Sequence, residues 1–87
     1  MTSWRKLIDK ALRFNNETWA DIEATTLTEE QLNTEFDHDE YGYHSGCAFT
    51  LWTKARVYFP TTHDGYEGVS FVPRNPCDEA TRHIGHE

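Results

Sequence analysis

The sequence predicts a small α+β domain in which two helices pack on one face of a three-stranded antiparallel sheet. The first residues repeat apolar side chains at helical spacing, and a helix-start signature follows Leu27. Three runs of alternating polarity, separated by turn signals, then fill residues 48–72. Eighty-seven residues are enough for one modest core. We therefore assign residues 1–87 to one domain, with a polar C-terminal tail from about residue 73.

The first helix is predicted over residues 3–14. Its apolar side chains recur at the i, i+3, i+4, i+7 and i+8 positions and form one stripe: Trp4, Leu7, Ile8, Ala11 and Leu12. Thr2 or Ser3 can cap the start, and the pair Asn15-Asn16 can end the helix. The basic residues lie off the stripe, as expected for an ordinary helix that packs on a core.

Residues 17–26 fit two patterns. Trp19 and Ile22 are spaced as in a helical turn, whereas Ile22 and Ala24 alternate as in a strand. We favour a turn followed by a short strand, which leaves open a fourth, edge strand over residues 20–26.

The second helix has a sharper start. Thr28 is a predicted N-cap, and Gln31 stands three residues later, which is the spacing of a capping box. The predicted helix runs from Glu29 to about Phe36. It should bury Leu32 and Phe36, which lie four residues apart on one stripe.

Three strands of a meander follow, in the runs AFTLWT, RVYFP and YEGVSFV. Lys54-Ala55 is a plausible tight connection between the first two, and Asp64-Gly65 is a strong hairpin signal between the last two. Alternation gives the predicted core face as Phe49, Leu51, Val57, Phe59, Val69 and Phe71. Trp52 and Tyr58 are predicted on the opposite face.

The composition predicts a cytoplasmic protein. No apolar run is long enough for a transmembrane span, and charges interrupt the apolar residues of the first segment, which is unlike a signal peptide. Two cysteines do not make a disulfide framework, so Cys47 and Cys77 are expected to be free thiols, with one bridge as the alternative. The tail contains Pro73 and Pro76, so we expect it to be an extended wrap or a loose end.

The net charge of −7 comes from one segment. Residues 14–53 contain nine acidic residues and no Lys or Arg, whereas both flanking segments are mixed in charge. Direct nucleic-acid binding requires clustered Lys and Arg, so this distribution disfavours it. No membrane partner is indicated either.

The segment EFDHDEYGYHSGC, residues 35–47, concentrates the side chains that could carry chemistry. It begins like a calcium loop, but Tyr41 and Ala48 stand where two oxygen ligands are needed. Cys47 near His44 has the residue types of a nucleophile and its base, but closeness in sequence does not establish a catalytic geometry. We therefore predict no enzymatic activity and no cofactor. The alternative is a small zinc-stabilised module that uses His44, Cys47, Cys77 and His83.

We predict instead that the acidic segment forms a binding face. An uncompensated negative field speeds encounter with cationic clefts, and aromatic side chains can then anchor the contact. The candidate partner-binding residues are Glu29, Glu30, Glu35, Asp37, Asp39, Glu40, Tyr41, Tyr43, Trp52 and Tyr58. Asp37, Asp39 and Glu40 should be exposed, with Phe36 beside them in the core. The alternative is a solvated surface that only confers solubility.

The stretches FTLWTKARVYFP and DGYEGVSFVPRNP, with SWRKLI and TLTEEQL before them, resemble short uncharacterised proteins encoded by tailed bacteriophages and prophages. The resemblance covers roughly residues 3–85. It implies a counter-defence or host-takeover factor, in the manner of anti-CRISPR and anti-restriction proteins, some of which mimic nucleic acid. The expected partner is a bacterial protein with a basic, nucleic-acid-binding surface in the cytoplasm of an infected host. An accessory protein that only assembles with itself, including as a homodimer, remains an alternative.

Overall fold

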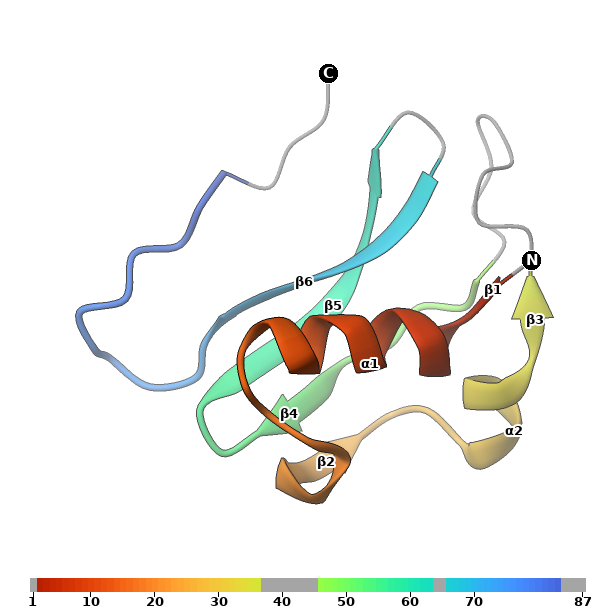
Figure 1. Cartoon of the computed structure of the whole chain (residues 1–87), viewed down its shortest axis with the longest axis horizontal. Coiled ribbons are helices and arrows are strands. Elements are labelled where there is room, and N and C mark those ends of the chain that lie inside the picture. Colours follow the sequence, from red (N-terminus) through yellow and green to blue (C-terminus); the bar gives the residue numbers. More distant parts are fainter. Residues whose placement is uncertain (1, 37–45, 64–65, 84–87) are drawn as a thin grey trace.

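The computed structural model describes residues 2–36, 46–63 and 66–83. The chain is mixed α+β, with two α-helices and two antiparallel sheets (Figure 1). The larger sheet has four strands in the order β2-β4-β5-β6, and the smaller pairs β1 with β3. The prediction of a three-stranded meander was therefore incomplete. The larger sheet contains that meander and, at its edge, β2, which confirms the fourth strand left open over residues 20–26. The smaller sheet was not predicted.

Helix α1 spans Trp4–Phe14 and follows strand β1, Thr2–Ser3. The side chain of Ser3 caps the helix by accepting a hydrogen bond from the Lys6 amide. The helix ends at the predicted place, where Asn15 is the C-cap and Asn16 adopts a positive φ of 60°. Its apolar stripe packs over β6, so α1 covers one face of the larger sheet (Figure 1).

The next segment contains a 3-10 turn, Trp19–Asp21, and then the edge strand β2, Ile22–Thr25. Helix α2, Glu29–Asn33, carries the predicted capping box, because Thr28 and Gln31 bond reciprocally through side chain and backbone. This helix makes its main contacts with α1 and not with the sheet, contrary to the predicted packing.

Strand β3, Glu35–Phe36, replaces the predicted last turn of the second helix. Phe36 pairs with Thr2 of β1 and is 7% exposed. Its ring centroid lies 5.0 Å from that of Trp4. The prediction that Phe36 belongs to the core is confirmed. The reason given for it was wrong, because Phe36 reaches the core from a strand.

Strands β4 (Leu51–Thr53), β5 (Arg56–His63) and β6 (Tyr66–Pro73) complete the larger sheet. Their register aligns Leu51, Tyr58 and Phe71 in one row that faces α1. Tyr58 is therefore a core residue, with 0% exposure, and its predicted place on the outer face was wrong. The expected Asp64-Gly65 turn lies outside the described residues.

The outer face of the sheet carries the row Trp52, Val57 and Val72, with Phe59 next to Val57 along β5. Alternation along β5 makes this arrangement unavoidable once Tyr58 points inward. Val57 and Phe59 were predicted in the core, and they are half-buried on the face opposite α1 instead. Within the described residues, no helix or strand follows Pro73.

Candidate functional site

The described part of the predicted binding face lies on α2 and β3. Glu29 and Glu30 occupy the first turn of α2, Glu35 lies in β3, and all three are exposed. Arg5 of α1 forms an ion pair with Glu29 at 2.6 Å. Among the described basic side chains, none lies within ion-pair distance of Glu30 or Glu35. Two carboxylates of the predicted face are therefore exposed and uncompensated at short range.

The other acidic candidates and two of the aromatic ones directly follow β3 in the chain. These residues are Asp37, Asp39, Glu40, Tyr41 and Tyr43, and they lie outside the described residues. Phe36 before them and Gly46 after them are packed together. A Cβ built on Gly46 would come within 2.9 Å of the Phe36 ring and 2.6 Å of the Trp4 ring. The two residues that flank the sequence 37–45 therefore lie on the same side of the core, against Trp4.

Trp52 lies on the uncovered face of the larger sheet and is half-buried. Ala24 of β2 is its cross-strand neighbour on one side, and Val57 of β5 on the other. Glu23, beside Ala24, is exposed and forms an ion pair with Arg74 at 2.5 Å. Trp52 therefore keeps part of its aromatic surface accessible on this face, one strand away from Glu23.

Tyr58 cannot act as a surface anchor, because its side chain is buried in a polar network. Its hydroxyl donates a hydrogen bond to Glu17 Oε1 and accepts one from Asn15 Nδ2 at 3.0 Å. Burial, reinforced by the hydrogen bond to Glu17, raises the pKa of the Tyr58 hydroxyl well above its ordinary value. Tyr58 therefore stays neutral and joins the end of α1 to the middle of the sheet.

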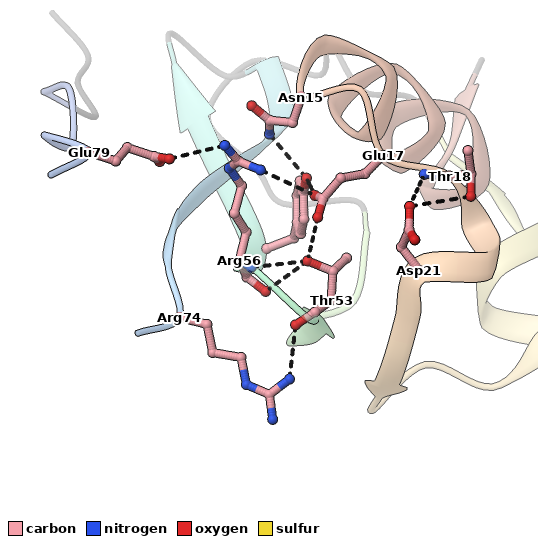
Figure 2. A network of polar contacts seen from close by, with 9 residues as sticks. Asn15, Glu17, Thr18, Asp21, Thr53, Arg56, Arg74 and Glu79 are labelled. Atoms are coloured by element: carbon pink, nitrogen blue, oxygen red, sulfur yellow. Dashed lines mark hydrogen bonds and ion pairs between the residues drawn. The ribbon is translucent and has the colours of Figure 1, made fainter. Parts of the chain in front are cut away.

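Glu17 is the centre of this network, with its side chain 11% exposed (Figure 2). Its second carboxylate oxygen accepts a hydrogen bond from the hydroxyl of Thr53 at 2.9 Å. Arg56 Nη1 lies 3.8 Å from Glu17, and Arg56 Nη2 forms an ion pair with Glu79 at 3.0 Å. A buried carboxylate with a phenol, a hydroxyl and a guanidinium around it is satisfied structurally. This arrangement joins the end of α1 to β4 and β5 through one carboxylate.

Arg56 also connects the tail to the sheet. Its guanidinium carbon lies 6.0 Å from the centroid of the Phe71 ring, and its buried Nε has no hydrogen-bond partner in the described part of the chain. Figure 2 shows Arg56 between Glu79 of the tail and Glu17. Sequence reasoning missed this cluster, because Glu17, Thr53 and Arg56 are distant in sequence and match no local motif.

The zinc alternative receives no geometric support from its described members. Cys47 and Cys77 are free and exposed, and His83 is exposed, whereas His44 lies outside the described residues. Across residues 2–36, 46–63 and 66–83, no group of three or more metal-binding side chains comes together. The Cys77 sulfur accepts a hydrogen bond from the Glu79 amide at 3.4 Å, a contact within the tail itself.

In the described portion of the chain, no helix has the length and apolar character needed to cross a bilayer. A scan against protein-family models, a search of curated proteins and a search of solved structures each found no match to this chain. The candidate function therefore rests on the chain's own residues and their arrangement.

Proposed function

We propose that this chain is a non-enzymatic binding protein whose acidic end contacts a basic, nucleic-acid-binding surface of a bacterial protein and inhibits or redirects it. The acidic end is defined by α2, β2, β3 and the acidic sequence 37–40 that follows β3. The observation that supports this most is the exposure of Glu30 and Glu35 without a described basic neighbour. Carboxylates placed in this way can occupy sites that otherwise hold phosphates.

The distribution of the basic residues gives the proposal further support. Lys54, Arg56, Arg74 and Arg82 all follow β4 in the chain, and two of them are engaged by Glu79 and Glu23. Within the acidic end, Arg74 pairs with Glu23 of β2 and Arg5 pairs with Glu29 of α2, whereas Glu30 and Glu35 have no described basic partner. The acidic end therefore keeps a net negative charge, while Trp52 next to β2 supplies apolar contact area.

The test is a pull-down from bacterial lysate with the tagged full chain, followed by kinetic measurements on the captured protein. Replacing Glu30 and Glu35 with Gln should slow association at low salt and leave the melting temperature nearly unchanged, because both side chains are exposed. The matched control is Asp78→Lys, which changes the net charge by the same two units in the tail.

The two variants separate a specific acidic surface from net charge alone. The proposal predicts a slower on-rate for Glu30→Gln/Glu35→Gln than for Asp78→Lys, with a difference that shrinks as salt screens the field. Equal on-rates for the two variants, or a captured protein that binds unchanged at high salt, would refute the role assigned to the acidic end.

A further inference from the structure

The outer edge of β6 is a free strand edge. The sheet order places β6 last, beyond β5. The Arg74 amide donates to the Ala55 carbonyl at 2.9 Å, so the pair Ala55 and Arg74 is a hydrogen-bonded pair of the ladder. Because inward and outward backbone groups alternate along a strand, Val69 and Phe71 direct their N–H and C=O groups away from β5. No described backbone hydrogen bond outside the helices and strands involves either residue.

A cleft runs between this edge and α1. It has a volume of about 440 Å³, and its apolar lining includes Leu7, Ala11, Phe14, Val69 and Phe71. Phe14 is 71% exposed, and its ring centroid lies 6.0 Å from that of Phe71. It is the one large apolar side chain classed as exposed among the described residues. Helix α1 lies over β6 (Figure 1), and the surface between the two elements is lined mainly by apolar side chains.

A second cleft continues on the far side of Phe14. It has a volume of about 560 Å³ and is lined by Val69 and Phe71 of β6 and by tail residues 79–83. The ion pair between Arg56 and Glu79 holds the tail across from the strand. The space beside β6 is thus bounded by α1 above and by the tail opposite.

The charges around these clefts differ from those of the acidic end. Lys10 and Glu67 line the first cleft, and Arg56, Glu79 and Arg82 line the second. Glu67 accepts a hydrogen bond from the Gly46 amide, and Glu79 forms an ion pair with Arg56. Lys10 and Arg82, by contrast, form no ion pair with any described residue. In a chain of net charge −7, two uncompensated cations at one edge favour an acidic occupant.

We propose that the β6 edge binds an extended acidic segment of a partner protein as an added strand. The backbone of that segment would bond to the outward N–H and C=O groups of Val69 and Phe71. Every second side chain would pack against Phe14 and Leu7, and its carboxylates would meet Lys10 and Arg82. This goes beyond the proposed function, because it uses a different edge of the molecule and the opposite partner charge.

The experiment selects binders for the full chain from a randomised library of free peptides about as long as β6, which has eight residues. Enriched peptides should alternate apolar residues and carry Asp or Glu. Val69→Pro removes one outward N–H without removing a bond to β5, and Val69→Ala is its matched control, since it loses side-chain contacts but keeps the N–H. The enriched peptide should bind the Pro variant about ten-fold more weakly than the Ala variant, the loss expected for one hydrogen bond.

Phe14→Ser provides an independent test, because its exposed ring can be removed without unfolding the chain. It should weaken the same peptide by about ten-fold or more at an unchanged melting temperature. The Phe14→Ser variant also tests binding at the β6 edge if Val69→Pro does not fold. The proposal is overturned by enrichment of peptides without alternation or acids, by no enrichment at all, or by equal affinity for the parent and Phe14→Ser. Concentration-dependent dimerisation that Phe14→Ser abolishes would also overturn it, in favour of a second copy as the occupant.

Discussion

Removing the Tyr58 hydroxyl should destabilise the fold more than most single-atom deletions. In Tyr58→Phe, Glu17 loses a buried donor and the Asn15 side chain loses an acceptor. A hydrogen bond to a charged group contributes roughly 1.5–3 kcal/mol, so we expect the free energy of unfolding to fall by about 2 kcal/mol. For a domain of this size, that corresponds to a drop in melting temperature of roughly 8–16 °C.

The pH dependence measures the burial of the Tyr58 hydroxyl, to which the hydrogen bond with Glu17 adds. The folded chain raises the pKa of Tyr58, so it holds the phenol proton more tightly than the unfolded chain does. The resulting stabilisation is complete below the ordinary tyrosine pKa of about 10 and is lost as the pH rises above it. Urea unfolding between pH 8 and pH 11 should therefore show a steeper loss of stability for the parent than for Tyr58→Phe.

A double-mutant cycle with Glu17→Gln separates the specific bond from general loss of packing. The two substitutions should couple, because each removes one side of the same hydrogen bond. Additive effects at pH 7 would show that the hydroxyl and the carboxylate do not stabilise each other. Identical pH slopes for the parent and Tyr58→Phe would show that the folded chain does not hold the phenol proton more tightly than the unfolded chain. Either result would refute this account of the core.

Three further changes test other parts of the fold. Phe36→Ala should reduce the free energy of unfolding by roughly 3–5 kcal/mol, as measured by urea denaturation, because the ring is buried against Trp4; a loss below about 1 kcal/mol would contradict its place in the core. Gly46→Ala should cost about 1–3 kcal/mol, because its Cβ would overlap the Trp4 ring; unchanged thermal unfolding would show that the ring can shift freely. Thr28→Ala should lower the free energy of unfolding by about 1 kcal/mol because the α2 cap is lost, and Thr28→Ser should keep most of the stability that the cap contributes. Equal melting temperatures for the two variants would exclude capping.

The parts of the fold that sequence predicts well are those governed by neighbours in the chain. The capping box at Thr28 and Gln31 and the end of α1 at Asn15 follow from backbone groups that adjacent side chains can satisfy. The apolar stripe of α1 similarly predicts which side of that helix is buried. These features depend little on the rest of the molecule.

The face assignment of β5 depends on partners that are remote in sequence. Alternation allows either Val57 and Phe59 or Tyr58 to point inward, and two apolar residues favour the first choice. Tyr58 points inward because its hydroxyl forms hydrogen bonds with two residues more than forty positions away. It donates to Glu17 and accepts from Asn15. Strand β3 has two residues and pairs with β1 across the fold, so no local periodicity indicates it.

The candidate sites likewise combine features that the sequence indicates with features that depend on contacts between remote residues. The absence of basic residues in the acidic segment is a property of the sequence, and Glu29, Glu30 and Glu35 of this segment are exposed in the structure. Their role in binding stays a prediction. The clefts beside β6 could not be predicted, because they depend on the position of the tail. Among the described residues, the tail is held by two long-range ion pairs, Arg56 with Glu79 and Glu23 with Arg74.

The β5–β6 hairpin and the β1–β3 sheet differ in the sequence separation of the residues that they pair. β5 and β6 are consecutive and pair along their whole length, from Arg56 with Pro73 to His63 with Tyr66. β1 and β3 join Thr2 to Phe36 and make only two pairings. Closing the longer loop costs more chain entropy and gains fewer bonds, so the hairpin should form early in folding and the small sheet late. In the folded protein, amide protons of β1 and β3 should accordingly exchange with solvent through local openings that leave the β5–β6 ladder intact.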